Sequence, residues 1–186
     1  MTQQEIIAGC LQNNRKCQQA LFAQYAGKML LVCQRYARNS QQAEDMLQQG
    51  FIRVFTALHT YRGQGSFEGW IRRIVVNASL RLLQTEQSSW KLVSANNPPE
   101  LPDESEDLAA LLTGKEIMQL IQQLPDGYRT VLNLFVFEQY SHDEIASLLQ
   151  ISPGTSRSQL AKARRMLLTL MEEQAKISTY EPRRAG

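Results

Sequence analysis

Cysteine and histidine are scarce in this sequence of 186 residues, and their scarcity excludes several kinds of site. The three cysteines, Cys10, Cys17 and Cys33, are odd in number and show no Cys-x-x-Cys spacing. This pattern indicates reduced thiols in the cytoplasm rather than a disulfide framework or a zinc site. The two histidines, His59 and His142, lie near no cysteine cluster, so we expect neither a metal ion nor another cofactor.

Long apolar runs are also missing. No window approaches the roughly 20 consecutive apolar residues of a membrane span, and the first twenty residues lack the basic start and apolar run of a signal peptide. We therefore expect a cytoplasmic protein that does not insert into a membrane. Glycine and proline are few, with ten and six residues, whereas 43% of the chain is hydrophobic, which favours helices with ordinary globular cores.

Charge is distributed unevenly along the chain. Residues 1–93 carry eleven Lys and Arg against five Asp and Glu, whereas residues 94–112 carry five acids and no base. The acidic strip also holds three prolines within residues 98–102, where a helical pattern fails. The sequence therefore predicts a first domain at 1–86, a flexible acidic linker at 87–112, a second domain at 113–175 and a tail at 176–186.

Apolar residues recur at helical spacing and strand alternation is absent, so the predicted fold class is all-α, with two small helical domains. A turn at 61–65 precedes Ser66, the expected N-cap of a third long helix. Two apolar stripes come before it, one of Leu21, Phe22, Tyr25, Met29, Val32, Cys33 and Tyr36, the other of Ala43, Met46, Leu47, Ile52, Phe55 and Leu58. Shorter helices are predicted over 113–123, 125–138, 142–149 and 153–175.

The strongest local signal is a helix-turn-helix in the second domain. Ser141 and Glu144 have the spacing of a capping box, and an apolar helical face follows them. Ser152 and Pro153 then mark the start of another helix, since proline fits the first helical turn. Two helices separated by a turn of three or four residues are typical of the helix-turn-helix, whose second helix meets base edges in the major groove.

The second helix carries side chains suited to DNA. Arginine can contact guanine with two hydrogen bonds and glutamine can do so with adenine, while basic residues further along suit phosphate anchoring. The predicted DNA-binding residues are Thr155, Ser156, Arg157, Gln159, Lys162, Arg164 and Arg165. Leu160, Ala163, Leu167 and Leu170 fit the core-facing stripe. A solvated basic helix face without a DNA role is the alternative that the motif leaves open.

Several motifs in register resemble one known family. Residues 43–55 (AEDMLQQGFIRVF) and 61–77 (YRGQGSFEGWIRRIVVN), with Leu124–Val131 and Ser141–Ala146, resemble the conserved regions of bacterial RNA polymerase sigma factors. With two domains and no third between them, the chain resembles the extracytoplasmic-function group. The resemblance implies a protein without catalytic activity or a small-molecule substrate, whose partners are core RNA polymerase, promoter DNA and often an anti-sigma factor.

The resemblance also implies roles for residues of the first domain. The polymerase-binding set comprises Glu44, Asp45, Gln48, Phe51, Arg53 and Val54. The set that recognises and melts the downstream promoter element comprises Tyr61, Arg62, Phe67, Trp70, Arg72, Arg73, Asn77 and Arg81. For Phe51, Val54, Phe67 and Trp70, a place in the core is the alternative reading. The acidic linker resembles the segment that follows polymerase's RNA path, with a solvated tether as its alternative.

Three residues depart from the family's pattern: Gln49 stands where Glu is usual, Gly50 lies inside a helix, and Arg81 replaces a common Asp or Asn.

Two other function classes remain open at this point. A helix-turn-helix regulator that does not dock on polymerase would explain the second domain but leave the first without a role. An enzyme acting on nucleic acid lacks support, because the sequence shows no clustered carboxylates for two metal ions, no Ser/His/Asp set and no phosphate loop.

Overall fold

The computed structural model describes residues 1–86 and 114–180, so the predicted linker at 87–112 lies outside the described residues. Every regular element in those two ranges is helical and none is a strand, which confirms the all-α prediction. The chain divides into two compact units, Met1–Ser88 and Ser89–Gly186, and each is described by itself.

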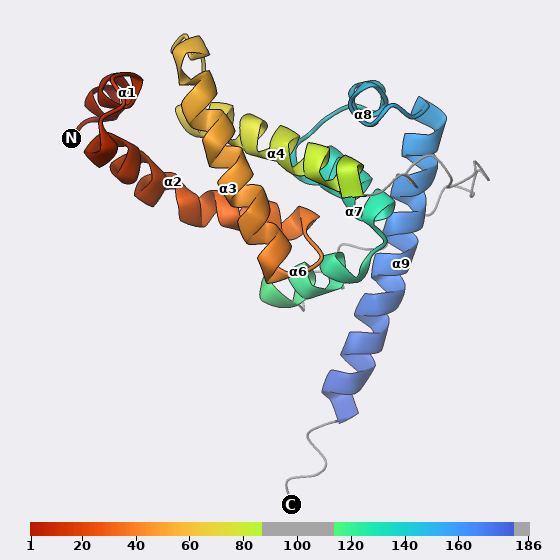
Figure 1. The fold of residues 1–186 in the computed structure, drawn as a ribbon. Helices are drawn as coiled ribbons and strands as arrows, with labels where there is room; N and C mark the ends of the chain where they lie inside the picture. Colours follow the sequence, from red (N-terminus) through yellow and green to blue (C-terminus); the bar gives the residue numbers. More distant parts are fainter. Residues whose placement is uncertain (87–113, 181–186) are drawn as a thin grey trace, which may run out of the picture. The chain divides into compact units, whose positions relative to one another are not determined.

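The first unit begins with α1 (Gln3–Leu11), α2 (Arg15–Tyr36) and α3 (Ser40–Ala57), and ends with η1 (Leu58–Thr60) and α4 (Phe67–Glu86), as Figure 1 shows. Side chains just before the first three helices stabilise the helix starts, because they accept hydrogen bonds from first-turn amides that have no partner inside the helix. These N-caps are Thr2, Asn14 and Asn39. Helices α2, α3 and α4 all contact one another, and α1 packs on α2.

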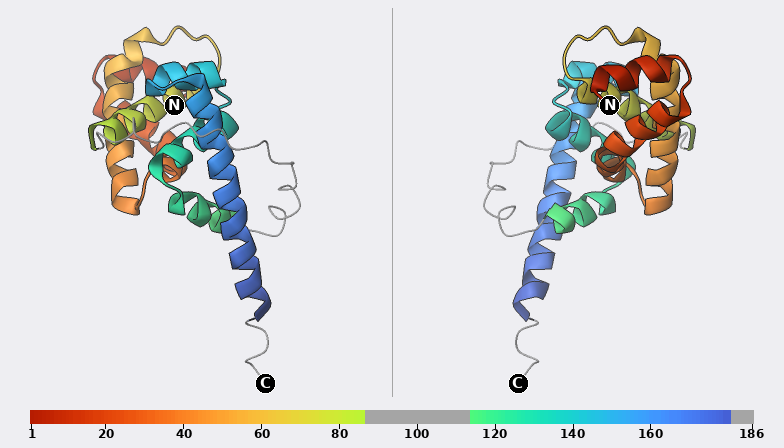
Figure 2. Two further views of the ribbon diagram at one scale, coloured as in Figure 1. Left: turned by 90° about the vertical axis from the view of Figure 1, so that its right-hand side faces the viewer. Right: turned by 90° about the vertical axis from the view of Figure 1, so that its left-hand side faces the viewer.

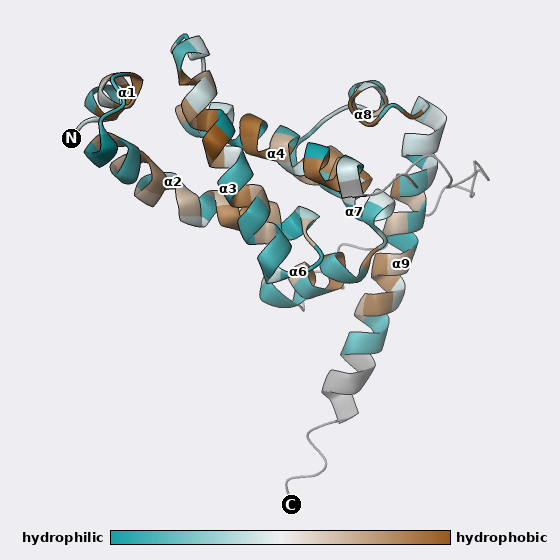
Figure 3. Cartoon of the chain, viewed as in Figure 1, coloured by the Kyte–Doolittle hydropathy of each residue, from teal (hydrophilic) through white to brown (hydrophobic). Residues whose placement is uncertain are grey.

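The core of the first unit corrects one residue in each of the two predicted stripes. Ile52 is 55% exposed, whereas Phe51 and Val54 are 3% and 0% exposed. The reason is the helical period: steps of three and four residues from Leu47 lead to Phe51 and Val54, not to Ile52. In Figure 3 each helix of this unit carries hydrophobic and hydrophilic residues, as expected for helices that bury one face. Phe22, in the other stripe, is also 40% exposed.

Gly50 explains how closely α3 crosses α4. A Cβ atom at this position would lie 2.9 Å from Val75 Cγ2 and 3.3 Å from Val75 Cα. Both distances are too short for an ordinary contact, and the β-branched valine has little freedom to turn away. The glycine that departs from the family's pattern, at a cost of about 1 kcal/mol in helix propensity, therefore permits the approach of the two helices.

We expect Gly50→Ala to destabilise the protein by about 1–2 kcal/mol, because the added methyl group overpacks the α3–α4 contact by more than the helix gains in propensity. The matched control is Gly27→Ala in α2, where nothing lies within 4 Å of the added Cβ. That substitution should raise stability by up to about 1 kcal/mol. Urea unfolding of the two variants measures the difference, and equal changes in both would contradict the role of Gly50.

The second unit contains α6 (Gly114–Gln123), α7 (Asp126–Leu132), a π-helical turn η3 (Asn133–Phe137), α8 (His142–Leu149) and α9 (Pro153–Tyr180). Helix α9, the long helix in both views of Figure 2, packs against α6, α7 and α8. The predicted bounds of α8 and the Ser141–Glu144 capping box are confirmed. The single helix predicted over 125–138 instead changes to the π-helical turn after Leu132, and α9 continues beyond residue 175.

A buried ion pair holds the junction between α6 and α7. Arg129 is 1% exposed and donates to the backbone carbonyls of Gln122 at 2.9 Å and Leu124 at 3.1 Å. The same guanidinium pairs with the carboxylate of Asp126, which is also nearly buried. The end of a helix leaves carbonyl groups without partners inside the helix, and Arg129 satisfies two of them. The charged side chain therefore has a structural role in the second unit.

Replacing Arg129 with methionine should destabilise the second unit by about 3–5 kcal/mol, because the nearly buried carboxylate of Asp126 would lose the guanidinium group that balances its charge. The control is Arg165→Met, at an exposed position of α9, which should change stability by less than about 0.5 kcal/mol. Thermal unfolding monitored by circular dichroism checks both. An unchanged melting temperature for Arg129→Met would show that the pair does not stabilise the fold.

Candidate functional site

The exposed side of α3 carries the polar members of the predicted polymerase-binding set. Glu44, Asp45, Gln48 and Arg53 are all exposed. Phe51 and Val54 are buried, and the ring of Phe51 meets that of Phe22 edge-on at 4.7 Å. The two apolar residues therefore belong to the core, and their assignment to the binding surface is corrected.

The apolar residue that the surface does offer is Ile52. It follows Asp45 by seven residues and Gln48 by four, which places all three on one side of α3. Its side chain is 55% exposed, so it lies open to solvent beside these polar residues. The same helical spacing was readable in the sequence, where Ile52 was instead assigned to the core stripe.

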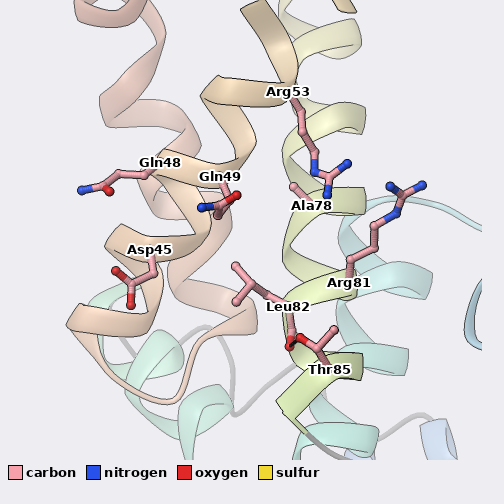
Figure 4. Close-up of a pocket in the computed structure, with 8 residues that line it drawn as sticks. All are labelled: Asp45, Gln48, Gln49, Arg53, Ala78, Arg81, Leu82 and Thr85. Carbon is pink, nitrogen blue, oxygen red and sulfur yellow. Dashed lines mark hydrogen bonds between the residues drawn. The ribbon is translucent and has the colours of Figure 1, made fainter. Parts of the chain in front are cut away.

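A groove of about 400 Å³ lies between α3 and α4 on this unit (Figure 4). Four residues of α3 and four of α4 line it: Asp45, Gln48, Gln49, Arg53, Ala78, Arg81, Leu82 and Thr85. In Figure 4 the side chain of Arg53 extends from α3 across toward α4. Three members of the polymerase-binding set thus meet Arg81, a member of the melting set, and Gln49 also lines the groove. Gln49 and Arg81 are two of the departures from the family's pattern.

Two glycines allow the backbone conformation of the loop before α4. Gly63 and Gly65 both have φ of +73°, a backbone conformation that residues with a side chain rarely adopt. The hydroxyl of Tyr61 donates to the carbonyl of Gly65 at 3.3 Å, and Ser66 Oγ accepts from the amide of Gly69 at the start of α4. Ser66 is therefore the N-cap that the sequence predicted, and the loop keeps Arg62 exposed.

Three aromatic rings of the predicted melting set form one cluster. Phe67 stacks on Trp70 with ring centroids 5.7 Å apart, and Tyr61 lies 4.8 Å from Phe67 and 5.4 Å from Trp70. Phe67 is 4% exposed and also meets Tyr25 edge-on, so it belongs to the core and its assignment to the DNA surface is corrected. Tyr61 and Trp70 are half-buried, which leaves part of each ring open to a ligand.

The remaining members of that set follow Trp70 along α4. Arg73, Asn77 and Arg81 come three, seven and eleven residues after it, a spacing that places them on one side of the helix. Arg73 and Arg81 are exposed, while Asn77 and Arg72 are half-buried. An aromatic ring, an amide and two guanidinium groups on one helix side suit an unpaired base and its phosphates.

The predicted DNA-binding residues of α9 fall into an accessible group and a buried group. Arg157, Arg164 and Arg165 are exposed, and Thr155 and Lys162 are half-buried. Ser152 is the N-cap that the sequence predicted, because its Oγ atom accepts from the amide of Thr155 at 3.0 Å.

Ser156 and Gln159 are 0% and 2% exposed, which corrects their assignment to the base-reading surface. They lie on the side of α9 that also buries Leu160 and Ala163. A Cβ atom added at Gly127 would lie 3.3 Å from Gln159 Oε1, so the glutamine packs against α7.

His142 is a residue of this site that sequence reasoning missed. Its ring stacks on Phe135, with centroids 4.7 Å apart and 20° between the planes. Its Nδ1 atom lies 2.9 Å from Ser156 Oγ, within hydrogen-bonding distance. Burial and then the charge of Arg157 lower the pKa of His142 below its ordinary value. The sequence contains no signal for this pairing, since the two residues are joined only by the fold.

The cysteines and the acids give no sign of a metal centre in the parts of the chain that the structure describes. Cys10, Cys17 and Cys33 are free and buried, and burial raises the pKa of the Cys33 thiol to about 11. Among residues 1–86 and 114–180, no three His, Cys, Asp or Glu side chains gather into a group that could hold a metal ion. Over the same ranges, no helix combines the length and the apolar character needed to cross a membrane.

Two family models match separate parts of the chain. The model described as sigma-70 region 2 matches residues 21–89, and the model described as sigma-70 region 4 matches residues 114–167. The first range contains α3, the loop and α4, and the second contains the helix-turn-helix. Both candidate surfaces therefore fall inside regions of one family.

Known proteins of that family align over most of the chain. It is 28% identical to the RNA polymerase sigma-H factor of Pseudomonas aeruginosa over 180 residues, 87% of this chain and 89% of that protein. It is 26% identical to the ECF RNA polymerase sigma-E factor of Escherichia coli over 181 residues, 88% and 91% of the two chains. In fold it is similar to the sigma factor RpoE from Bartonella quintana, crystallised with the anti-sigma factor NepR, with a TM-score of 0.51, 14% identity and coverage of 83% and 96%.

Proposed function

Because the chain belongs to the extracytoplasmic-function group of sigma-70 RNA polymerase sigma factors, we propose that it binds core RNA polymerase and directs it to specific promoters. One observation supports this most strongly: a single chain holds both a helix-turn-helix unit and a second helical unit with its own exposed polar surface. A plain DNA-binding regulator would leave the first unit without a role.

The first unit serves polymerase docking and promoter opening in this proposal. The docking surface consists of Glu44, Asp45, Gln48 and Arg53, with Ile52 as its apolar centre. Acceptors, a guanidinium group and one aliphatic side chain together suit a protein partner. The neighbouring surface, which holds the melted strand, consists of Tyr61, Arg62, Trp70, Arg72, Arg73, Asn77 and Arg81. Half-exposed rings stack on unpaired bases while arginines hold phosphates.

The second unit binds the upstream promoter element through α9. Arg157, with Thr155 beside it, is exposed at the helix start and reads base edges in the major groove. Lys162, Arg164 and Arg165 hold phosphates and contribute affinity without sequence preference. The segment at 87–112 tethers the two units so that each reaches its own promoter element.

The proposal also covers catalysis, the cellular location and a further partner. It carries no catalytic activity and acts in the cytoplasm, where polymerase and promoter DNA are found. An anti-sigma factor is a further partner, since the Bartonella sigma factor with a similar fold was crystallised with one.

Run-off transcription tests the function: core polymerase with the purified protein should start at defined sites on genomic fragments. If DNA binding persists but core polymerase is not bound, the protein is instead a helix-turn-helix regulator.

Ile52→Glu should weaken binding to core polymerase by about tenfold or more, because a carboxylate would occupy the apolar centre of the docking surface. Asp45→Lys should have an effect in the same direction through reversed charge. Fluorescence titration of the labelled protein with core polymerase measures both.

The matched control for Ile52 is Leu31 in α2, which is also 55% exposed but lies on another helix. Leu31→Glu should leave the affinity for polymerase unchanged. Equal losses for the two glutamate variants would mean that the docking surface is not centred on α3.

Arg157→Ala should weaken promoter binding of the holoenzyme by about 1–3 kcal/mol and relax the preference for one base pair of the upstream element. Lys162→Ala should lower affinity evenly across DNA sequences and reduce the dependence on salt. Gel-shift titrations on promoter variants at two salt concentrations separate the two effects. Uniform loss on all sequences for Arg157→Ala would rule out its base-reading role.

A further inference from the structure

We propose that His142 is a positioning residue for promoter recognition, which fixes the first turn of α9 through Ser156 and thereby sets where Arg157 meets the DNA. The inference rests on the proposed function of the second unit. It concerns a side chain that neither the motif nor the family resemblance assigned to DNA binding.

The contact joins three elements at one point. His142 is the first residue of α8, its ring lies flat against Phe135 of η3, and its Nδ1 atom lies 2.9 Å from Ser156 Oγ in α9. Stacking fixes the plane of the ring, and the hydrogen bond fixes the direction of one nitrogen within that plane. Together they specify where the Ser156 hydroxyl can lie.

Ser156 transmits this constraint to the recognition helix. It is 0% exposed and lies in the first turn of α9, immediately before the exposed Arg157. A buried hydroxyl without a partner is costly, so rotation or sliding of the helix start is opposed by loss of the His142 contact. Bidentate recognition of guanine requires correct distances for two hydrogen bonds at once. A small shift in the backbone at Arg157 therefore weakens the sequence preference.

Electrostatics links His142 to the same arginine. Burial, then Arg157, and more weakly Arg164 lower the pKa of His142, while Asp143 opposes them. When DNA phosphates come close to Arg157 and Arg164, they should offset this positive field, and we expect the pKa of His142 to be higher in the complex than in the free protein. The resulting gain in affinity is complete below the free pKa and is lost as the pH rises through the pKa of the complex.

The experiment compares His142→Leu with His142→Asn in holoenzyme reconstituted with core polymerase. Leucine retains bulk against Phe135 but gives the Ser156 hydroxyl no partner, whereas asparagine places a polar atom close to the position of Nδ1. The probes are the promoter and a variant changed at the base pair whose recognition depends on Arg157. We expect His142→Leu to reduce the preference between them about tenfold and His142→Asn to retain most of it.

Two further measurements separate positioning from a purely structural role. Ser156→Ala should reproduce the loss of preference, and the double variant should be no worse than either single one, because both remove the same contact. Between pH 8 and 6, wild-type affinity should rise relative to that of His142→Asn, which has no group that titrates there.

Loss of affinity for both DNA probes by the same factor, with the preference intact, would overturn the proposal and leave His142 a stabilising residue only. A pH profile identical in wild type and His142→Asn would overturn the coupling to Arg157. Failure of the proposed function is a different result, because wild-type holoenzyme would then start at no defined site.

Discussion

The first unit depends on how closely α3 crosses α4 at Gly50 and Val75. Because residue 50 has no side chain, the buried side of α3 packs closely against α4. The opposite side of α3 faces solvent and carries the polar residues. The same two helices border the groove that Gln49 and Arg81 line. One close contact thus sets both the separation of the two helices and the position of the surface that each presents.

The second unit solves a different problem, because its helices are short and their ends are buried. The carbonyl groups at the end of α6 need partners, and Arg129 supplies them while its own charge is balanced by Asp126. Replacement of both partners by an apolar pair of similar volume is often neutral in such sites, so the net stabilisation from the pair is smaller than the loss expected when Arg129 alone is removed. Helix α9 packs on α7, which follows this junction, and the position of the recognition helix depends on it.

Three helix starts could be predicted from the sequence because their signals are local. The caps at Ser141 and Ser152 and the helix start at Ser66 each need only a side chain and an amide two or three residues away, and the structure contains all three. Helix α1 was missed although Thr2 and Glu5 form a capping box, because no long apolar stripe accompanies it. The error at Ile52 was avoidable, because the helical period from Leu47 already points to Phe51 and Val54. The errors at Ser156 and Gln159 have another cause, because only the tertiary packing decides which polar side chains of α9 turn inward.

The groove between α3 and α4 connects the two tasks proposed for the first unit. Arg53 and Arg81 bring two positive charges to it, and Asp45 is the one carboxylate among the lining residues. A glutamate at residue 49 would balance a second of these charges, whereas Gln49 leaves the groove with a net positive charge. In the proposed function, the polymerase surface on α3 and the promoter strand along α4 would therefore approach the same charged groups. Under the proposed function, a change in one occupant would alter the field on the other, so we expect polymerase docking and strand opening to be coupled through this groove.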